Sequence, residues 1–116
     1  MESVRKVVRA KAYFLTPEEG GRDQNLYFDV DISDPRYPEY EVLADFGFGY
    51  TKEGYKIACA AHVGLEDGPG SIELGVEQTV LVGLFCPAEV VKPGASFDLS
   101  EGRKLVAKCT VLSVIE

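Results

Sequence analysis

Two side chains in one short segment carry the groups that acid–base or thiol chemistry needs. His62 is the only histidine among the 116 residues, so any imidazole base must be this residue. Cys59 lies three residues earlier, in a segment whose alternating apolar residues predict a strand. Because side chains in a strand alternate between its two faces, this offset places Cys59 and His62 on opposite faces. The spacing argues against a Cys–His pair, and we expect no catalytic residue.

Acidic residues and glycines stand together in LEDGPGSIE, residues 65–73, which raises the question of Ca²⁺ binding. The segment lacks the alternating Asp and Asn ligands of oxygen-coordinating loops, and we interpret it as a turn. The phosphate-binding pattern G-x-x-x-x-G-K-[ST] is absent, as is G-x-G-x-x-G between a strand and a helix. The sequence therefore predicts no metal site, no cofactor and no enzyme activity.

The three cysteines, Cys59, Cys86 and Cys109, are far apart, show no C-x-x-C spacing and each lie in an apolar stretch. We expect buried free thiols rather than a disulfide or a metal site. No apolar run approaches the roughly 20 residues that span a bilayer, and the N-terminus alternates charged and apolar residues, unlike a signal peptide. We expect a soluble, cytoplasmic protein with one domain over residues 1–116 and no membrane contact.

The elements that position these residues are predicted to be strands. Apolar residues alternate with polar ones in several runs, and no segment repeats apolar residues at helical spacing. The predicted strands are residues 4–15, 26–32, 42–46, 55–63, 78–85, 95–100 and 103–115. Proline and glycine separate them, and Glu101–Gly102 is the expected two-residue link of the last hairpin. The nearly all-apolar run 78–85 is expected to be covered on both faces.

Periodicity makes the chain all-β but does not distinguish a sandwich from a closed barrel. AKAYFLTPEEGGRDQN, residues 10–25, resembles the first strand and following loop of the C-terminal β-barrel, the third domain, of elongation factor Tu, where the loop commonly reads E-E-G-G-R. The second half is similar in layout, with a TVLVGLF strand before Pro87, an E-G-R turn and a last strand ending in VLSVIE. The resemblance implies a six-stranded antiparallel closed β-barrel.

The E-E-G-G-R loop has a physical interpretation of its own. Its two glycines let the chain leave the first strand through a conformation that is costly for other residues. Its charged residues are expected to close the loop by charge-assisted hydrogen bonds. The predicted loop-shaping residues are Glu18, Glu19, Gly20, Gly21 and Arg22.

The charge is −7 overall and is concentrated in residues 23–54, which hold eight acidic residues against Arg36 and Lys52. An acidic region repels phosphate backbones, and its tyrosines are typical of a protein contact, with core or strand-edge packing as the alternative. The predicted partner-binding residues are Asp29, Asp31, Tyr37, Tyr40, Glu41 and Asp45. Nucleic acid is disfavoured by the net charge.

The family barrel is joined to a GTPase domain and contacts both the T-stem of aminoacyl-tRNA and the nucleotide exchange factor. Here the nucleotide-binding motifs are missing, and Asp23–Gln24–Asn25 replaces the family's H-T-P. We therefore expect a stand-alone, non-enzymatic barrel that binds a protein partner as an adaptor, decoy or inhibitor. The alternative is an accessory translation protein that binds tRNA or the ribosome. Its basic contacts would be Arg22, Arg103 and Lys104, with Arg5, Arg9 and Lys11.

A small-ligand barrel or a cryptic enzyme is a third interpretation. No set of polar residues converges in the sequence to support it.

Overall fold

The alternation of apolar and charged residues at the start of the chain forms the long strand β1 (Ser3–Phe14). Ala10, Ala12 and Phe14 are fully buried, whereas Lys11 between them is exposed. This is the predicted period of two, with one face in the core and one in water. The structure is a computed structural model, and it describes residues 3–28, 40–54, 57–66 and 70–115.

Strands make up nearly all of the regular structure in these ranges, which contain no α-helix. After β1 come the 3-10 turn η1 (Pro17–Glu19), β2 (Leu26–Phe28), β3 (Glu41–Asp45), β4 (Cys59–Gly64), β5 (Gly70–Ile72), β6 (Glu77–Pro87), the 3-10 turn η2 (Ala88–Val90), β7 (Ser96–Glu101) and β8 (Lys104–Val114).

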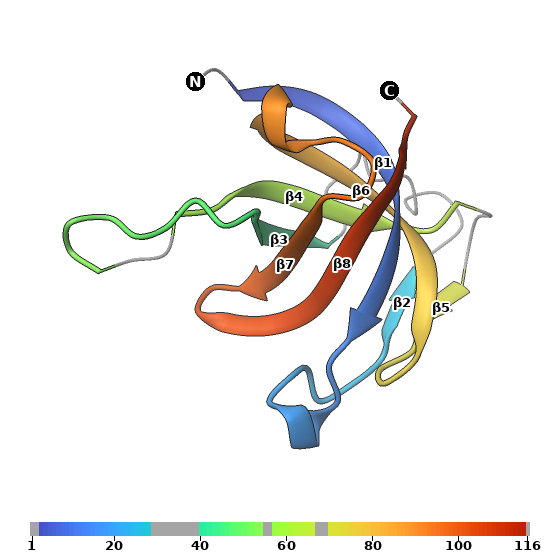
Figure 1. Cartoon of the computed structure of the whole chain (residues 1–116). Helices are drawn as coiled ribbons and strands as arrows, with labels where there is room; N and C mark the ends of the chain where they lie inside the picture. The colour runs from blue at the N-terminus through green and yellow to red at the C-terminus, as the bar shows by residue number, and fades with distance from the viewer. Residues whose placement is uncertain (1–2, 29–39, 55–56, 67–69, 116) are drawn as a thin grey trace.

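Six of the strands close into a barrel in the order β1, β6, β4, β3, β7, β8, and all of their pairings are antiparallel (Figure 1). The predicted fold class, an all-β six-stranded antiparallel closed barrel, is therefore confirmed. Strands β2 and β5 pair with each other in a separate two-stranded sheet. Each barrel strand thus has a partner on both sides, and the closed barrel leaves no unpaired edge strand.

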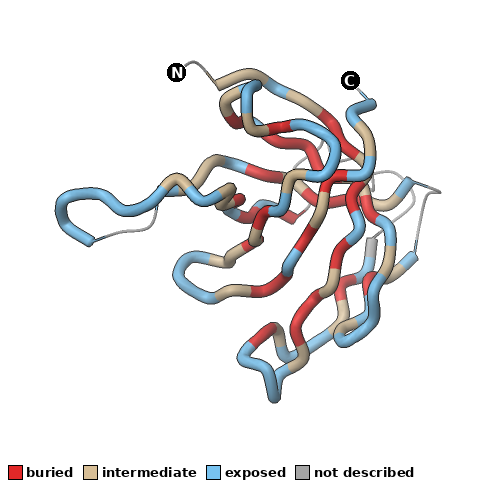
Figure 2. Tube along the Cα trace, viewed as in Figure 1, coloured by how far each residue is buried: buried red, intermediate tan, exposed pale blue. Residues whose placement is uncertain are grey.

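The core fills the inside of the barrel, and Figure 2 shows buried residues along the barrel strands. Val80, Val82 and Leu84 of β6 point inward and are fully buried. The expectation that this strand is covered on both faces is wrong at Phe85, which points outward and is 54% exposed. The barrel has a single interior, so the apolar run of β6 also supplies residues to the outer surface.

Most predicted boundaries differ from the structure by one or two residues, and two of the differences bear on the site. Residues 57 and 58 precede β4, so the predicted strand begins later, at Cys59. The link of the last hairpin is Gly102–Arg103 rather than Glu101–Gly102, because Glu101 pairs with Lys104 as the end of β7. Gly102 has the expected positive φ, 60°.

The expectation of three free thiols is wrong for two of them. Cys59 and Cys86 form a disulfide with a Cα–Cα distance of 5.4 Å, whereas Cys109 is free and buried. Strands β4 and β6 are antiparallel neighbours in which Ala60 lies opposite Phe85. The residues just outside that pair are the two cysteines. Their 27-residue separation in the sequence does not reveal this register.

The loop after β1 is shaped by hydrogen bonds within T-P-E-E-G-G. The Thr16 amide donates to the Glu19 carboxylate at 2.9 Å, and the Glu19 amide donates back to the Thr16 hydroxyl at 3.3 Å, which is a capping box. The Tyr13 hydroxyl also donates to Glu19, at 3.0 Å. Hydrogen bonds from Thr16 and Tyr13 hold the pKa of Glu19 below its ordinary value. The predicted closing role is thus taken by Glu19, although both Glu18 and Glu19 are exposed.

The two glycines of this loop serve different purposes. Gly20 ends η1 with a φ of 89°, a left-handed conformation that favours glycine. Gly21 has no such φ, but a Cβ there would collide with the backbone carbonyl of Leu15. The first glycine is required by conformation and the second by close packing of the chain on itself.

No helix in the described part of the chain is long and apolar enough to cross a membrane.

Candidate functional site

The outer face of β3 brings acidic and apolar side chains together in the middle of the acidic region. Val42 and Ala44 point into the core, so the alternation places Glu41, Leu43 and Asp45 on the outside. Leu43 is 42% exposed although it lies within a closed sheet between β4 and β7. Strand β3 therefore presents a leucine to solvent between two carboxylates.

The neighbouring strands continue this exposed position sideways. Leu43 lies opposite Ala60 of β4, and Ala60 lies opposite Phe85 of β6. In the other direction Leu43 lies opposite Ser100 of β7, which in turn lies opposite Leu105 of β8. We call Leu43, Ala60, Phe85 and Leu105 the apolar row. With Ser100, these residues form one continuous line across five strands of the outer surface.

An arm made of residues 46–54 and 57–58 rises beside this row and extends away from the barrel (Figure 1). At its base, the Phe46 ring stacks on Phe97 with centroids 4.8 Å apart. Farther out, the Ile57 amide donates to the Gly49 carbonyl at 2.9 Å. Most of the arm is exposed (Figure 2), and its Tyr50 is 68% exposed. The arm thus adds an aromatic side chain to the apolar surface.

A groove runs between the arm and the turn of the β7–β8 hairpin. One hollow is lined by Leu43, Leu105 and Tyr50, with Glu53 and Arg103 also lining it. A second hollow is lined by Leu43, Ala60 and His62. The two hollows share Leu43, Ser100 and Gly102. They therefore form one groove whose floor is part of the apolar row.

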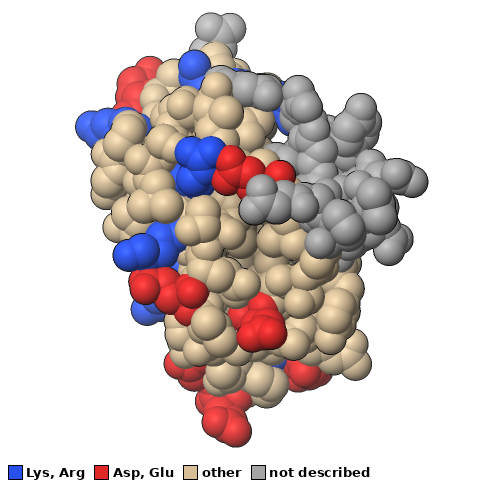
Figure 3. Space-filling view, turned by 90° about the vertical axis from the view of Figure 1, so that its right-hand side faces the viewer, with Lys and Arg blue, Asp and Glu red and all other residues tan. Residues whose placement is uncertain are grey.

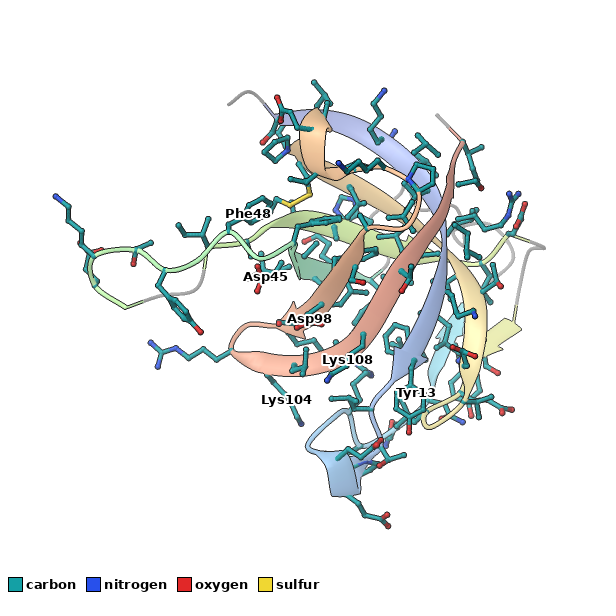
Figure 4. The ribbon with its side chains drawn as sticks, viewed as in Figure 1. Tyr13, Asp45, Phe48, Asp98, Lys104 and Lys108 are labelled. Carbon is teal, nitrogen blue, oxygen red and sulfur yellow. A yellow bond between two sulfur atoms is a disulfide. The ribbon has the colours of Figure 1, made fainter. Side chains whose placement is uncertain are left out.

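A row of polar side chains lies next to the apolar row. Register pairs Tyr13 of β1 with Lys108 of β8, Lys108 with Asp98 of β7, and Asp98 with Asp45 of β3. Figure 4 shows these four labelled residues following one another across the strands. Two carboxylates, Asp45 and Asp98, thus lie directly opposite each other, an arrangement that favours a nearby cation. One oxygen of Asp45 also accepts the Gly47 amide at 2.8 Å.

The opposite flank of the apolar row carries Glu41 and His62, which face each other across β3 and β4. The His62 Nε2 lies 3.5 Å from the Glu41 carboxylate, an ion pair when the imidazole is protonated. Cys59 points to the inside of the barrel and is bonded to Cys86, so no Cys–His pair exists. Glu41 keeps a largely exposed side chain beside Leu43.

The predicted partner-binding residues fall into three groups. Glu41 and Asp45 lie on the outer face of β3, as Leu43 of the apolar row does. Tyr40, in contrast, is only 9% exposed and belongs to the core. The remaining three, Asp29, Asp31 and Tyr37, lie outside the described residues.

Tyr40 and two charged residues form a cluster at the end of the barrel. The Tyr40 hydroxyl donates a hydrogen bond to Glu101, and Arg22 forms an ion pair with the same carboxylate. The Arg22 guanidinium also lies over the Tyr40 ring, 5.2 Å from its centroid. Burial alone would raise the pKa of Glu101, but the hydrogen bonds from Tyr40 and Arg22 hold it below its ordinary value of 4.5.

This cluster engages one residue of the predicted RNA-binding set, the partly buried Arg22, in contacts within the fold. Arg22 serves Glu101 and donates to the Gln24 carbonyl at 3.3 Å. Arg103 and Lys104 are exposed at the β7–β8 turn, and Figure 4 shows Lys104 there. Among the other cations, Arg9 pairs with Glu66, and Lys11 lies 3.8 Å from Glu77. Figure 3 shows blue and red groups interspersed on the face that it views.

Groups suited to metal or thiol chemistry are not assembled in the described ranges. No set of three or more His, Cys, Asp or Glu side chains there is arranged to hold a metal ion. Burial raises the pKa of the Cys109 thiol, and nearby Asp98 adds to the effect. This thiol is therefore kept protonated, which is the unreactive form.

Sequence reasoning predicted the acids of this site but missed the apolar row. Two sequence patterns indicated that residues of the apolar row point outward. Leu43 alternates with Glu41 and Asp45, and Phe85 has the opposite parity to Val82 and Leu84. The row becomes visible only when the register of five strands is known, and no single segment of the sequence contains that register.

No protein-family model matches the chain, and no curated protein is similar enough to it to identify a relative.

Proposed function

We propose that this chain is a non-enzymatic protein-binding domain that holds its partner on the outer face of β3. The observation that carries the proposal is the apolar row, which is flanked by carboxylates on both sides. Leu43 and Phe85 are about half exposed in one line of side chains. Contiguous exposed apolar surface with a polar rim is typical of protein contacts.

The negative charge around the apolar row indicates which class of protein surface this chain binds. Glu41 flanks the row on one side and Asp45 with Asp98 on the other, while Glu53 lines the groove. The chain as a whole carries −7, so a second copy would be repelled and a basic surface attracted. The partner is therefore a protein surface with apolar side chains flanked by lysine or arginine. This chain acts on that partner as an adaptor, decoy or inhibitor.

Kinship with the third domain of elongation factor Tu is part of the proposal. It is supported by the E-E-G-G-R loop and by a barrel of the class that this resemblance implies. The local structure gives Gly20 and Gly21 separate physical reasons to be glycine. The motif is therefore stronger evidence for the shape of the loop than for kinship with elongation factor Tu.

The alternative partner, tRNA or the ribosome, is disfavoured by how the cations are used. Arg22 is paired with Glu101, Arg9 with Glu66 and Lys11 with Glu77. A cation that is already paired releases fewer counterions from a phosphate backbone, which is the main source of affinity for nucleic acid.

A cytoplasmic location stays a prediction. The Cys59–Cys86 disulfide counts against it, because disulfides persist mainly in oxidising compartments. In the cytoplasm such a bond would be subject to reduction.

The proposal is tested with a fluorescein-labelled peptide of alternating lysine and leucine, titrated with the protein at low salt and followed by anisotropy. A peptide of alternating glutamate and leucine controls for charge, and bulk tRNA tests the alternative. We expect the cationic peptide to bind, with an affinity that falls as salt screens the carboxylates.

Matched variants locate the contact. Leu43→Ser and Phe85→Ser remove exposed side chains of the row, whereas Val76→Ser removes a similarly exposed side chain (45%) from the turn before β6. The first two are expected to weaken binding and the third to leave it unchanged. Equal binding of both peptides, or equal loss in all three variants, would refute the proposal, and tRNA binding that is lost in Arg103→Ala would favour the alternative.

A further inference from the structure

We propose that the Cys59–Cys86 disulfide is a redox latch that holds the arm of the groove in place. The inference rests on the proposed function, because the groove is the site that the latch would regulate. It starts from the position of the bond, which joins the first residue of β4 to the next-to-last residue of β6.

The bond lies where the pairing of β4 with β6 ends. The paired residues run from Gly64 opposite Leu81 to Ala60 opposite Phe85, and the cysteines come next. One residue before Cys59 the chain enters the returning limb of the arm, at residues 57–58. The disulfide therefore ties the start of β4, where this limb enters the barrel wall, to the end of β6.

Ring stacking and a hydrogen bond join the outgoing base of the arm to the barrel. Phe46 stacks on Phe97 at the outgoing base, and Asp45 accepts the Gly47 amide there. The returning limb has the Ile57–Gly49 hydrogen bond, which stays within the arm itself. Loss of the disulfide would leave the start of β4 held on one side by the pairing of Cys59 with Ala44 of β3, and on the other by the β6 pairs that begin at Ala60. Segments with few buried contacts open locally at low cost.

The two cysteines differ in burial. Cys59 is a half-buried residue at the end of the strand pairing, whereas Cys86 is fully buried, so local opening exposes the disulfide first from the Cys59 side. A thiolate of a dithiol reductant attacks the Cys59 Sγ, the Sγ–Sγ bond breaks, and Cys86 leaves with the electron pair and takes up a proton. The second thiol of the reductant then displaces Cys59, which also takes up a proton. The reductant is oxidised to a disulfide and both cysteines are reduced by two electrons in total.

The disulfide is coupled to the groove because the residues next to each cysteine in the sequence belong to the groove or to the apolar row. Ala60, which follows Cys59, lines the groove floor, and Phe85, which precedes Cys86, is the exposed end of the same line of side chains. Opening the disulfide therefore loosens one wall of the groove and the outward residues beside it. The oxidised form is the binding-competent form.

The test is amide hydrogen exchange, read by mass spectrometry, on the whole chain before and after reduction with dithiothreitol. Peptides covering the arm and the start of β4 are expected to exchange about tenfold faster or more after reduction, at labelling times at which β1 and β8 remain protected. The Cys59→Ala, Cys86→Ala double variant should match the reduced protein without any reductant. Cys109→Ala should respond to dithiothreitol as the unaltered chain does.

Three results would overturn the latch. One is unchanged exchange in the arm after reduction is verified by a mass gain of two hydrogens. Another is faster exchange spread evenly over all strands, which would mean global destabilisation only. The last is resistance of the bond to dithiothreitol in the folded protein. Unaltered chain is used for the main measurement, so failure of the double variant to fold does not decide the outcome.

The outcome is separate from that of the proposed function. Peptide binding that is identical in both redox states refutes the latch and leaves the binding proposal standing. Exchange that behaves as expected, with no peptide binding in either state, refutes the binding proposal.

Discussion

The hydroxyl of Tyr40 donates a hydrogen bond to the carboxylate of Glu101, 61 residues later in the chain. The same carboxylate receives the guanidinium of Arg22, which lies over the Tyr40 ring. Three segments meet in this cluster: the loop after η1, the residue before β3 and the end of β7. The pairing of β3 with β7 covers only Leu43–Asp45, so the cluster holds together the shortest seam of the barrel.

Removal of the Glu101 charge is expected to destabilise this seam. Glu101→Gln should lower the free energy of unfolding by about 1–3 kcal/mol, because the donors of Tyr40 and Arg22 lose their charged acceptor. Tyr40→Phe should cost about 1 kcal/mol, since the Arg22 pair survives. Urea unfolding followed by circular dichroism measures both. Glu53→Gln, at an exposed position of the arm, is the control and should stay within about 0.5 kcal/mol.

The same cluster predicts a dependence of stability on pH at both ends of the scale. The pKa of Glu101 is lowered in the fold, so its contribution is present above pH 4.5 and is lost as pH falls through the lowered value. The pKa of Tyr40 is raised, by burial and by Glu101, so its contribution is present below pH 10.0 and is lost above it.

Unfolding curves from pH 3 to 11, about the accessible range, test this with matched variants. The difference between the unaltered chain and Glu101→Gln should shrink in acid, and the difference from Tyr40→Phe should shrink in alkali. Differences that stay constant across the range would contradict the assigned directions of the two pKa shifts.

The two loop glycines predict unequal costs for the same substitution. Gly21→Ala forces a Cβ against the Leu15 backbone and should lower the free energy of unfolding by about 3 kcal/mol. Gly20→Ala meets no atom and costs only the left-handed conformation, about 1 kcal/mol. Thermal unfolding of the two variants shows which substitution lowers the melting temperature more. A larger loss in Gly20→Ala would show that conformation, and not packing, governs the loop.

The disulfide predicts a loss of stability on its removal. It closes a loop between residues 27 apart, so Cys59→Ala with Cys86→Ala should lower the free energy of unfolding by about 3–4 kcal/mol in the chain-entropy account. Cys109→Ala removes one buried thiol of the core and serves as the comparison. Denaturant titration under oxidising conditions measures the difference, which should disappear when the unaltered chain is reduced.

Local pattern was enough to predict the barrel strands, but not β5 (Gly70–Ile72), which lies in the segment interpreted as a turn. In β1 the alternation of Ala10, Lys11 and Ala12 identifies both the element and its buried face. The closed barrel came from the resemblance rather than from the pattern, because alternation describes a half-buried strand equally well in a sandwich. The turn at Gly102 was predicted as a turn but shifted by one residue, since pairing of Glu101 with Lys104 decides where the strand ends.

Long-range register explains the rest. The sequence predicted Cys59 and Cys86 to be separate buried thiols, because only the pairing of β4 with β6 shows that they lie side by side. Tyr40 was assigned to a contact surface together with Glu41, although consecutive residues of an extended chain point to opposite sides. The acidic composition drew attention to Glu41 and Asp45. The leucine between them could be recognised as part of a continuous surface only from its neighbours on β4 and β7.

The most direct test of the account is a titration of ¹⁵N-labelled, oxidised protein with the alternating lysine–leucine peptide, followed by amide chemical shifts. The account predicts that the largest shifts belong to Leu43, Ala60 and Phe85, with Val76 and the C-terminal end of β8 unaffected. Shifts centred on Arg103 and Lys104 alone, or scattered evenly over the barrel, would contradict the claim that the apolar row is the binding surface.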